Sequence, residues 1–91
     1  MKELLELEER HREQLRGANV RGVAVDIARS LIAKPIMTIP EAAKVVGRGY
    51  QTVSTAVAKL VELDILLPYG DGHPRRYLAP DVLAVIQRRR S

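Results

Sequence analysis

The chain contains no cysteine, tryptophan or phenylalanine, and only three tyrosines among its 91 residues. Without cysteine it can form neither a disulfide nor a thiolate zinc site, and it has no cysteine nucleophile. We expect a core of Leu, Val, Ile and Ala, pinned by the three tyrosines. The longest apolar run, 82–86, has five residues, whereas a membrane span needs about 18. Met1-Lys2-Glu3-Leu4 also lacks the apolar start of a signal peptide, so we expect a soluble, cytoplasmic protein.

What the chain does contain is typical of one small globular domain, with 46% apolar and 29% charged residues. Its net charge of +4 is unevenly distributed. Residues 1–16 carry four basic and five acidic side chains, whereas residues 17–91 carry eleven basic and six acidic ones. A small basic module raises the expectation of a polyanionic partner such as DNA. The same charge is equally compatible with a role in solubility alone.

The N-terminal segment, residues 2–16, is predicted to form a mostly polar helix that ends at Gly17 as a C′ glycine. A helix of this kind packs by one edge only or bridges to another part of a protein. Its few apolar residues are therefore candidates for contact with a partner. They are Leu4, Leu5, Leu7 and Leu15, and His11 completes the stripe.

Residues 20–33 show the apolar spacing of a second helix, which faces the core. Asn19 is its predicted N-cap. Lys34-Pro35 is its predicted end, because the residue before a proline avoids the α region. A very short strand is expected at Ile36-Met37.

Thr38-Ile39-Pro40-Glu41 is the clearest local motif. Thr38 as N-cap and Glu41 three residues later form a capping box, and the missing N–H of Pro40 does no harm in a first turn. The short helix that follows is predicted to end at Gly47. Another helix, 50–63, comes after the turn Gly47-Arg48-Gly49 and places its valines and Leu60 on one face. Two helices joined by a glycine-bearing turn make a helix-turn-helix.

The apolar period then changes from 3.6 to 2, which predicts strands at 65–69 and 75–79 around a turn. A last helix opens at Pro80-Asp81. This order predicts a mainly α (small α+β) fold, a winged helix-turn-helix with an N-terminal helical extension and a two-stranded wing. We expect residues 1–17 to be a linker helix and residues 18–91 to be the winged-helix domain.

A set of residues between about Val20 and Ile86 forms a recognisable pattern: Pro35, Thr38-Ile39-Pro40-Glu41-Ala42-Ala43, Gly47, Tyr50-Gln51-Thr52-Val53, the run 56–66, Arg75-Arg76-Tyr77 and the closing helix 81–86. Through these residues the sequence resembles the C-terminal winged-helix domain of Fic-family proteins. Two positions depart from the family pattern. Gly49 stands where a Ser or Thr cap is frequent, and Asp64 stands where a C′ glycine is usual, so that helix end should be capped in a different way.

The enzymatic domain of that family carries a His-Pro-Phe … Gly-Asn-Gly-Arg loop that transfers AMP to protein hydroxyls. Here His73-Pro74 begins in the same way, but Arg75 follows, and Gly-Asn-Gly-Arg is absent from the chain. The resemblance therefore implies a bacterial-type regulatory domain that binds DNA and is excised from a Fic-family protein. The chain itself is not expected to be an enzyme, although its parent protein would be an AMP transferase.

The sequence gives little support for metal binding, nucleophilic catalysis or dinucleotide binding. The two histidines, His11 and His73, are far apart in sequence and have no cysteine to join them, so we expect no metal site and no cofactor. Ser54 and Thr55 have no His–Asp pair near them in sequence, so neither is expected to be a nucleophile. Thr52 stands where a dinucleotide-binding fingerprint beginning at Gly47 would need its third glycine.

The exposed face of helix 50–63 is the candidate contact surface for double-stranded DNA. Gln51 suits bidentate hydrogen bonds to adenine, and Thr55 and Lys59 suit base edges or phosphates. Arg48 lies at the N-terminus of this helix, where backbone N–H groups also hold phosphates. Basic residues on the wing would follow the adjacent groove or backbone. The full candidate set is Arg48, Tyr50, Gln51, Thr52, Ser54, Thr55, Lys59, His73, Arg75 and Arg76.

A second interpretation stays open on sequence alone. The domain could be a docking module that binds its own catalytic domain, or a second copy through the N-terminal helix, without binding DNA. The leucines of the N-terminal helix favour this interpretation. Glu62 and Asp64, near the end of helix 50–63, favour a third one, in which this face is ordinary solvated surface. No membrane partner is expected.

Overall fold

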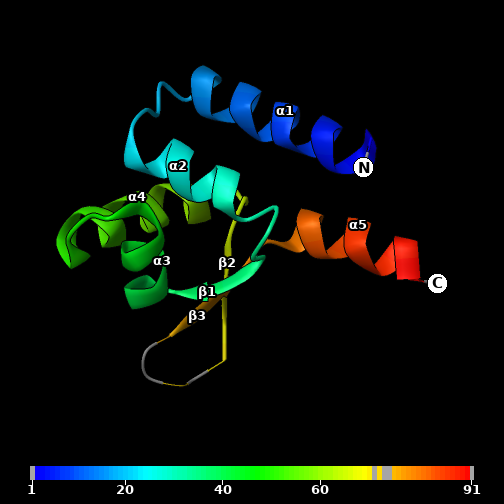
Figure 1. Ribbon diagram of the computed structural model, residues 1–91. Coiled ribbons are helices and arrows are strands. Elements are labelled where there is room, and N and C mark those ends of the chain that lie inside the picture. The colour runs from blue at the N-terminus through cyan, green and yellow to red at the C-terminus, as the bar shows by residue number, and fades with distance from the viewer. Residues whose placement is uncertain (1, 71, 73–74, 91) are drawn as a thin grey trace.

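The computed structural model describes residues 2–70, 72 and 75–90. These residues form five helices and a three-stranded antiparallel sheet, a small α+β domain (Figure 1). None of these five helices combines the length and apolarity that crossing a bilayer requires. The elements in chain order are α1 (Lys2–Gly17), α2 (Val23–Ser30), β1 (Ile36–Thr38), α3 (Ile39–Val46), α4 (Tyr50–Glu62), β2 (Leu67–Tyr69), β3 (Arg76–Leu78) and α5 (Pro80–Arg90).

The sheet has the order β1-β3-β2, with β3 in the middle. Both pairs are antiparallel, and Tyr77 of β3 lies between Met37 of β1 and Pro68 of β2. Pro68 has no N–H to donate, and an edge strand such as β2 is where a sheet accommodates that loss. The predicted strands are therefore confirmed, including the short one before Thr38, although β2 begins two residues later than expected and β3 is shorter at both ends.

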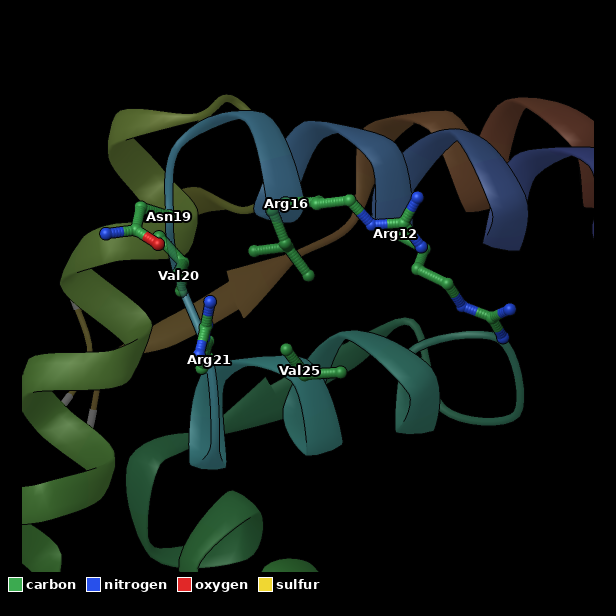
Figure 2. A pocket seen from close by; sticks show the side chains of 7 residues that line it. Arg12, Arg16, Asn19, Val20, Arg21 and Val25 are labelled. Carbon is green, nitrogen blue, oxygen red and sulfur yellow. The ribbon is translucent and has the colours of Figure 1, made fainter.

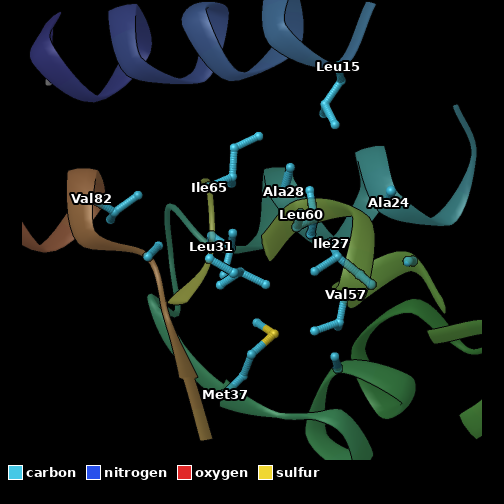
Figure 3. Close-up of a cluster of buried hydrophobic side chains, with 14 of the residues drawn as sticks. Leu15, Ala24, Ile27, Ala28, Leu31, Met37, Val57, Leu60, Ile65 and Val82 are labelled. Atoms are coloured by element: carbon cyan, nitrogen blue, oxygen red, sulfur yellow. The ribbon is translucent and has the colours of Figure 1, made fainter. Parts of the chain in front are cut away.

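The core is aliphatic, as the composition predicts. Ile27, Val53 and Leu60 are completely buried. Figure 3 shows Ile27 of α2 beside Leu60 of α4 within this core. The expected role of the tyrosines is wrong: Tyr50 and Tyr69 are 59% and 50% exposed, and Tyr77 is only partly buried against the core. Leu, Ile, Val, Ala and Met37 fill the interior without an aromatic ring.

Helix α1 packs on this domain along a single stripe. It lies across α2 and α5 in Figure 1, and it buries Leu7, His11 and Leu15, which follow one another at intervals of four residues. Near the free ends of both helices, Arg88 of α5 reaches Glu3 of α1 at 3.5 Å. Leu7 and Leu15 were predicted to contact a partner outside the domain. This prediction is wrong, because α2 and α5 already cover both side chains. Leu5, at 66% exposed, is the leucine of this helix that faces solvent.

The ends of α1 and α2 differ from the expected ones. Gly17 lies inside α1, and the left-handed residue that ends the helix is Asn19, with φ of 59°. The N–H of Val20 then donates to the carbonyl of Leu15 at 2.8 Å, the six-to-one hydrogen bond of a Schellman motif. Asn19 is thus not the N-cap of α2. That helix starts at Val23, after Gly22, and has no side-chain cap.

Helix α4 ends with the same motif. Asp64 adopts a φ of 59°. The N–H of Ile65 donates to the carbonyl of Leu60 at 3.0 Å, and the N–H of Asp64 donates to the carbonyl of Val61 at 3.0 Å. The expectation that this end is capped in a different way is therefore wrong. An aspartate takes the left-handed position itself, at a steric cost that a glycine would avoid.

The capping box of α3 is confirmed. Thr38 Oγ1 accepts a hydrogen bond from the N–H of Glu41 at 3.3 Å, and Glu41 Oε1 accepts one from the N–H of Thr38 at 2.9 Å. Lys34 Nζ lies 2.8 Å from the other carboxylate oxygen of Glu41. These bonds hold the pKa of Glu41 at about 2, mainly through Lys34 and then through Thr38. Gly47 ends the helix in the left-handed conformation, as predicted.

Candidate nucleic-acid interface

Helix α4 has one buried and one exposed face. Val53, Val57 and Leu60 are at most 2% exposed and fix the rotation of the helix against α2 and α3. At 100° per residue, Gln51 and Thr55 lie opposite this buried stripe. Both are exposed, so the predicted inward and outward faces of the helix are confirmed.

The structure places the predicted site residues unequally. Ser54 is only half-exposed, because it lies on the flank of α4 near the buried face. His73 lies outside the described residues. The others are exposed: Arg48, Tyr50, Gln51, Thr52, Thr55, Lys59, Arg75 and Arg76.

The start of α4 is open to a ligand on its polar side. Gly49 is its N-cap and offers no side-chain acceptor, so the backbone N–H groups of the first turn receive no side-chain cap. Arg48 precedes it and is exposed. One turn into the helix, the Thr55 hydroxyl donates to the carbonyl of Gln51 at 3.1 Å. This bond leaves the hydroxyl oxygen of Thr55 as an acceptor and the amide of Gln51 without a partner among the described residues.

At the far end of the exposed face, an acidic side chain offsets the charge of Lys59. Lys59 Nζ lies 3.4 Å from Glu62 Oε2, and both side chains are more than half exposed. An exposed pair of this kind contributes only a few tenths of a kcal/mol, so a phosphate can compete for Lys59. Sequence reasoning missed Ala58, which is exposed and lies between Gln51 and Glu62 on this face. Its small side chain permits close approach of another surface. The signal in the sequence was its position seven residues after Gln51 and four residues before Glu62, which places it on the same helix face.

The hairpin of β2 and β3 supplies a second basic element. It extends away from the helices in Figure 1. Arg76 is exposed and stands in register with Tyr69 of β2 on one side and with Thr38 of β1 on the other. Tyr69 is half-exposed and was not among the predicted site residues. An exposed aromatic ring directly across the strand from an arginine suits a sugar or a base better than it suits a core.

A separate arginine-lined groove, of about 340 Å³, lies where α1 meets the start of α2 (Figure 2). Figure 2 shows Arg12 and Arg16 extending from α1, and Arg21 in the segment before α2, to the left of Val25. Arg16 is paired with Glu13 at 3.1 Å, and Arg12 with Glu8 and Glu9 at 3.5 and 3.4 Å. The glutamates of α1 largely neutralise this groove.

Within the described part of the chain, no three His, Cys, Asp or Glu side chains gather as a metal ion would require. No family model, no curated protein and no solved structure matches this chain. The candidate interface consequently depends on the geometry of α4 and the hairpin.

Proposed function

We propose that this domain is a winged helix-turn-helix that binds double-stranded DNA, with α4 in the major groove and the β2–β3 hairpin against the adjacent backbone. The observation that supports this proposal best is the two-faced character of α4. Its buried stripe holds the helix rigidly, while Gln51 and Thr55 point directly away from the core, followed by the small Ala58. Groove readers need polar side chains on a rigid helix, and this helix provides them.

Phosphate contacts would come from four exposed cations. Arg48 at the start of α4 and Lys59 on its third turn flank the polar face, and Arg75 and Arg76 belong to the hairpin. If all four contact phosphates, the logarithm of the affinity falls with the logarithm of salt at a slope of about −3.6, because each contact contributes about −0.9. Raising the salt from about 50 to about 200 mM then weakens binding by about 10²-fold.

The regulatory part of the proposal comes from the resemblance to the C-terminal domains of Fic-family proteins. In such an arrangement, DNA binding by this domain would control the expression or placement of a catalytic domain elsewhere. This role follows only if DNA is bound, so DNA binding is tested first.

Fluorescence anisotropy with a labelled 25-base-pair duplex tests the proposal at both salt concentrations, at pH 7.5. Lys59→Ala, Arg48→Ala and Arg76→Ala should each reduce the salt slope by about 0.9 and weaken binding. Arg10→Ala is the matched control, because it removes the same charge from the exposed surface of α1. Absence of binding at 50 mM salt would refute DNA binding. An equal loss in Arg10→Ala would refute the assignment to α4 and the hairpin.

A further inference from the structure

His11 is a buried polar group whose ring has no hydrogen-bond partner among the described residues. Its side chain sits in the middle of the stripe between Leu7 and Leu15, where α1 meets α2 and α5, and the residue is 2% exposed. In the part of the chain that the structure describes, neither Nδ1 nor Nε2 has a partner within hydrogen-bonding distance. The carboxylate of Asp81 on α5 faces the ring, with Oδ2 at 3.9 Å from Nε2, which is too far for a hydrogen bond.

The surroundings of the ring favour its neutral form. A cavity of only about 10 Å³ adjoins it, about the space of one water molecule, so a charged imidazolium in place could gain at most one water of hydration. Burial lowers the pKa of His11 below its usual 6.5, and the neighbouring Arg10 acts in the same direction. Asp81 opposes this shift but does not overcome it. Arg29 of α2 also lines the cavity, together with Glu8 and Arg12 of α1.

Helix α1 packs on the rest of the fold through a single stripe. It contributes two of the eighteen buried apolar residues described, Leu7 and Leu15, while the later helices, the sheet and the segments that join them supply the others. Outside this stripe, Leu4 of α1 is partly buried against the core, Gln14 Nε2 donates to the carbonyl of Leu63 at 3.3 Å, and Glu3 forms an exposed pair with Arg88. Loss of the α1 packing therefore leaves a core that still joins α2, α3, α4 and the sheet, with α5 held by its buried Val82 and Val85.

We propose that α1 is a proton-released arm: protonation of His11 opens the packing of α1 against α2 and α5 while the remainder of the domain stays folded. The released helix places the imidazolium in water, where it is stable, and exposes the apolar surface of α2 and α5 that α1 had covered. The sign follows from linkage. The open state binds the proton more tightly than the packed state, so opening becomes more favourable as the pH falls through 6.5.

The size of the effect has an upper limit. The limit applies if the packed state does not bind the proton at all. The equilibrium constant for opening of α1 is then proportional to 1 + 10^(6.5 − pH). Between about pH 7.5 and 5.5, opening of α1 then increases by at most about tenfold. Asp81 reduces this factor, because its carboxylate stabilises the proton in the packed state as well.

Native-state hydrogen exchange of the whole domain, corrected for intrinsic exchange rates, tests the proposal at these two pH values. We expect α1 amides to lose protection by up to tenfold at the lower pH, and amides of α4 to be unaffected. Asp81→Asn removes the carboxylate that stabilises the proton in the packed state, so the loss of exchange protection in α1 should come closer to the tenfold limit. His73→Gln, which removes the other histidine, should leave the pH effect unchanged.

Two variants at position 11 make the outcome decisive. His11→Leu should protect α1 more strongly and at both pH values equally, because an apolar side chain fills the same site without titrating. His11→Gln keeps a polar group there, so protection should be low but again independent of pH. A pH effect that persists in either variant would overturn the proposal, as would an equal loss of protection in α1 and α4, which would indicate global unfolding. DNA binding at pH 7.5 does not depend on this device, so the two proposals can fail separately.

Discussion

Replacing Asp64 by glycine tests the interpretation of the helix ends directly. Asp64 closes α4 with φ of 59°, a conformation in which the Cβ of an L-residue crowds its own backbone. The hydrogen bonds from the N–H groups of Asp64 and Ile65 to the last turn of α4 require this conformation. Glycine adopts it without the steric penalty, so the substitution should stabilise the domain.

The magnitude follows from two opposing contributions. The left-handed conformation costs an ordinary L-residue about 1–2 kcal/mol, and aspartate is at the lower end of that range. Glycine in turn loses more backbone freedom on folding, by about 0.5 kcal/mol. The net gain for Asp64→Gly is therefore about 0.5–1 kcal/mol. For a domain of 91 residues, this corresponds to an increase in Tm of about 3–6 °C.

Thermal unfolding followed by circular dichroism measures this shift. Asp64→Ala is the matched control, since it removes the same carboxylate but keeps the Cβ, and we expect its Tm to fall. Asn19→Gly should raise the Tm in the same way at the end of α1, where Asn19 has the same φ of 59°. If both substitutions at position 64 shift the Tm in one direction, the carboxylate rather than the backbone determines stability there, and the reasoning is refuted.

Four further predictions concern α4 and the elements that support it. Gly47→Ala should cost about 1 kcal/mol in urea unfolding through its φ of 67° alone, because nothing lies within 4 Å of the added Cβ; an effect near zero would contradict the left-handed turn. Thr38→Ala should cost about 1 kcal/mol by removing a helix cap. The pKa of Glu41 is lowered to about 2, so the stabilisation of the fold by its carboxylate is complete above about pH 4.5 and is lost as the pH falls toward 2. In Glu41→Gln, this part of the pH dependence of the urea midpoint should be absent. Leu60→Ala, at a site with no exposure, should cost about 2–5 kcal/mol, and a smaller loss in chemical denaturation would indicate a loosely packed core.

Where the determinants were local, sequence reasoning predicted the fold closely. The capping box from Thr38 to Glu41 is complete within four residues, so both partners were visible in the sequence. The junction of α1 and α2 failed for the opposite reason. Gly17 and Asn19 can both end a helix, and the choice depends on Val20, which packs against the core and donates its N–H to Leu15. Rules for helix ends consider only neighbouring residues, so they could not predict that Val20 packs against the core.

The candidate interface shows the same division. Helical periodicity alone predicted the outward direction of Gln51, Thr55 and Lys59. It did not separate the centre of the exposed face from its flank, where Ser54 is half-buried, or reveal the ion pair of Lys59 with Glu62. Tyr69 was missed because a strand of three residues at a sheet edge gives no periodicity that would tell an outward ring from an inward one.

The two outer helices of the domain differ in how firmly they are held, and this difference connects the two proposals. Helix α4 buries four residues, of which Val53 and Leu60 have no exposed surface, so its polar face keeps one orientation. Helix α1 buries three residues in a single row, and the middle one, His11, stabilises the contact only while it is uncharged. Salt pairs along the rest of α1 are exposed and contribute little to its attachment. A proton can therefore change the position of α1 without disturbing the helix that we propose to contact DNA.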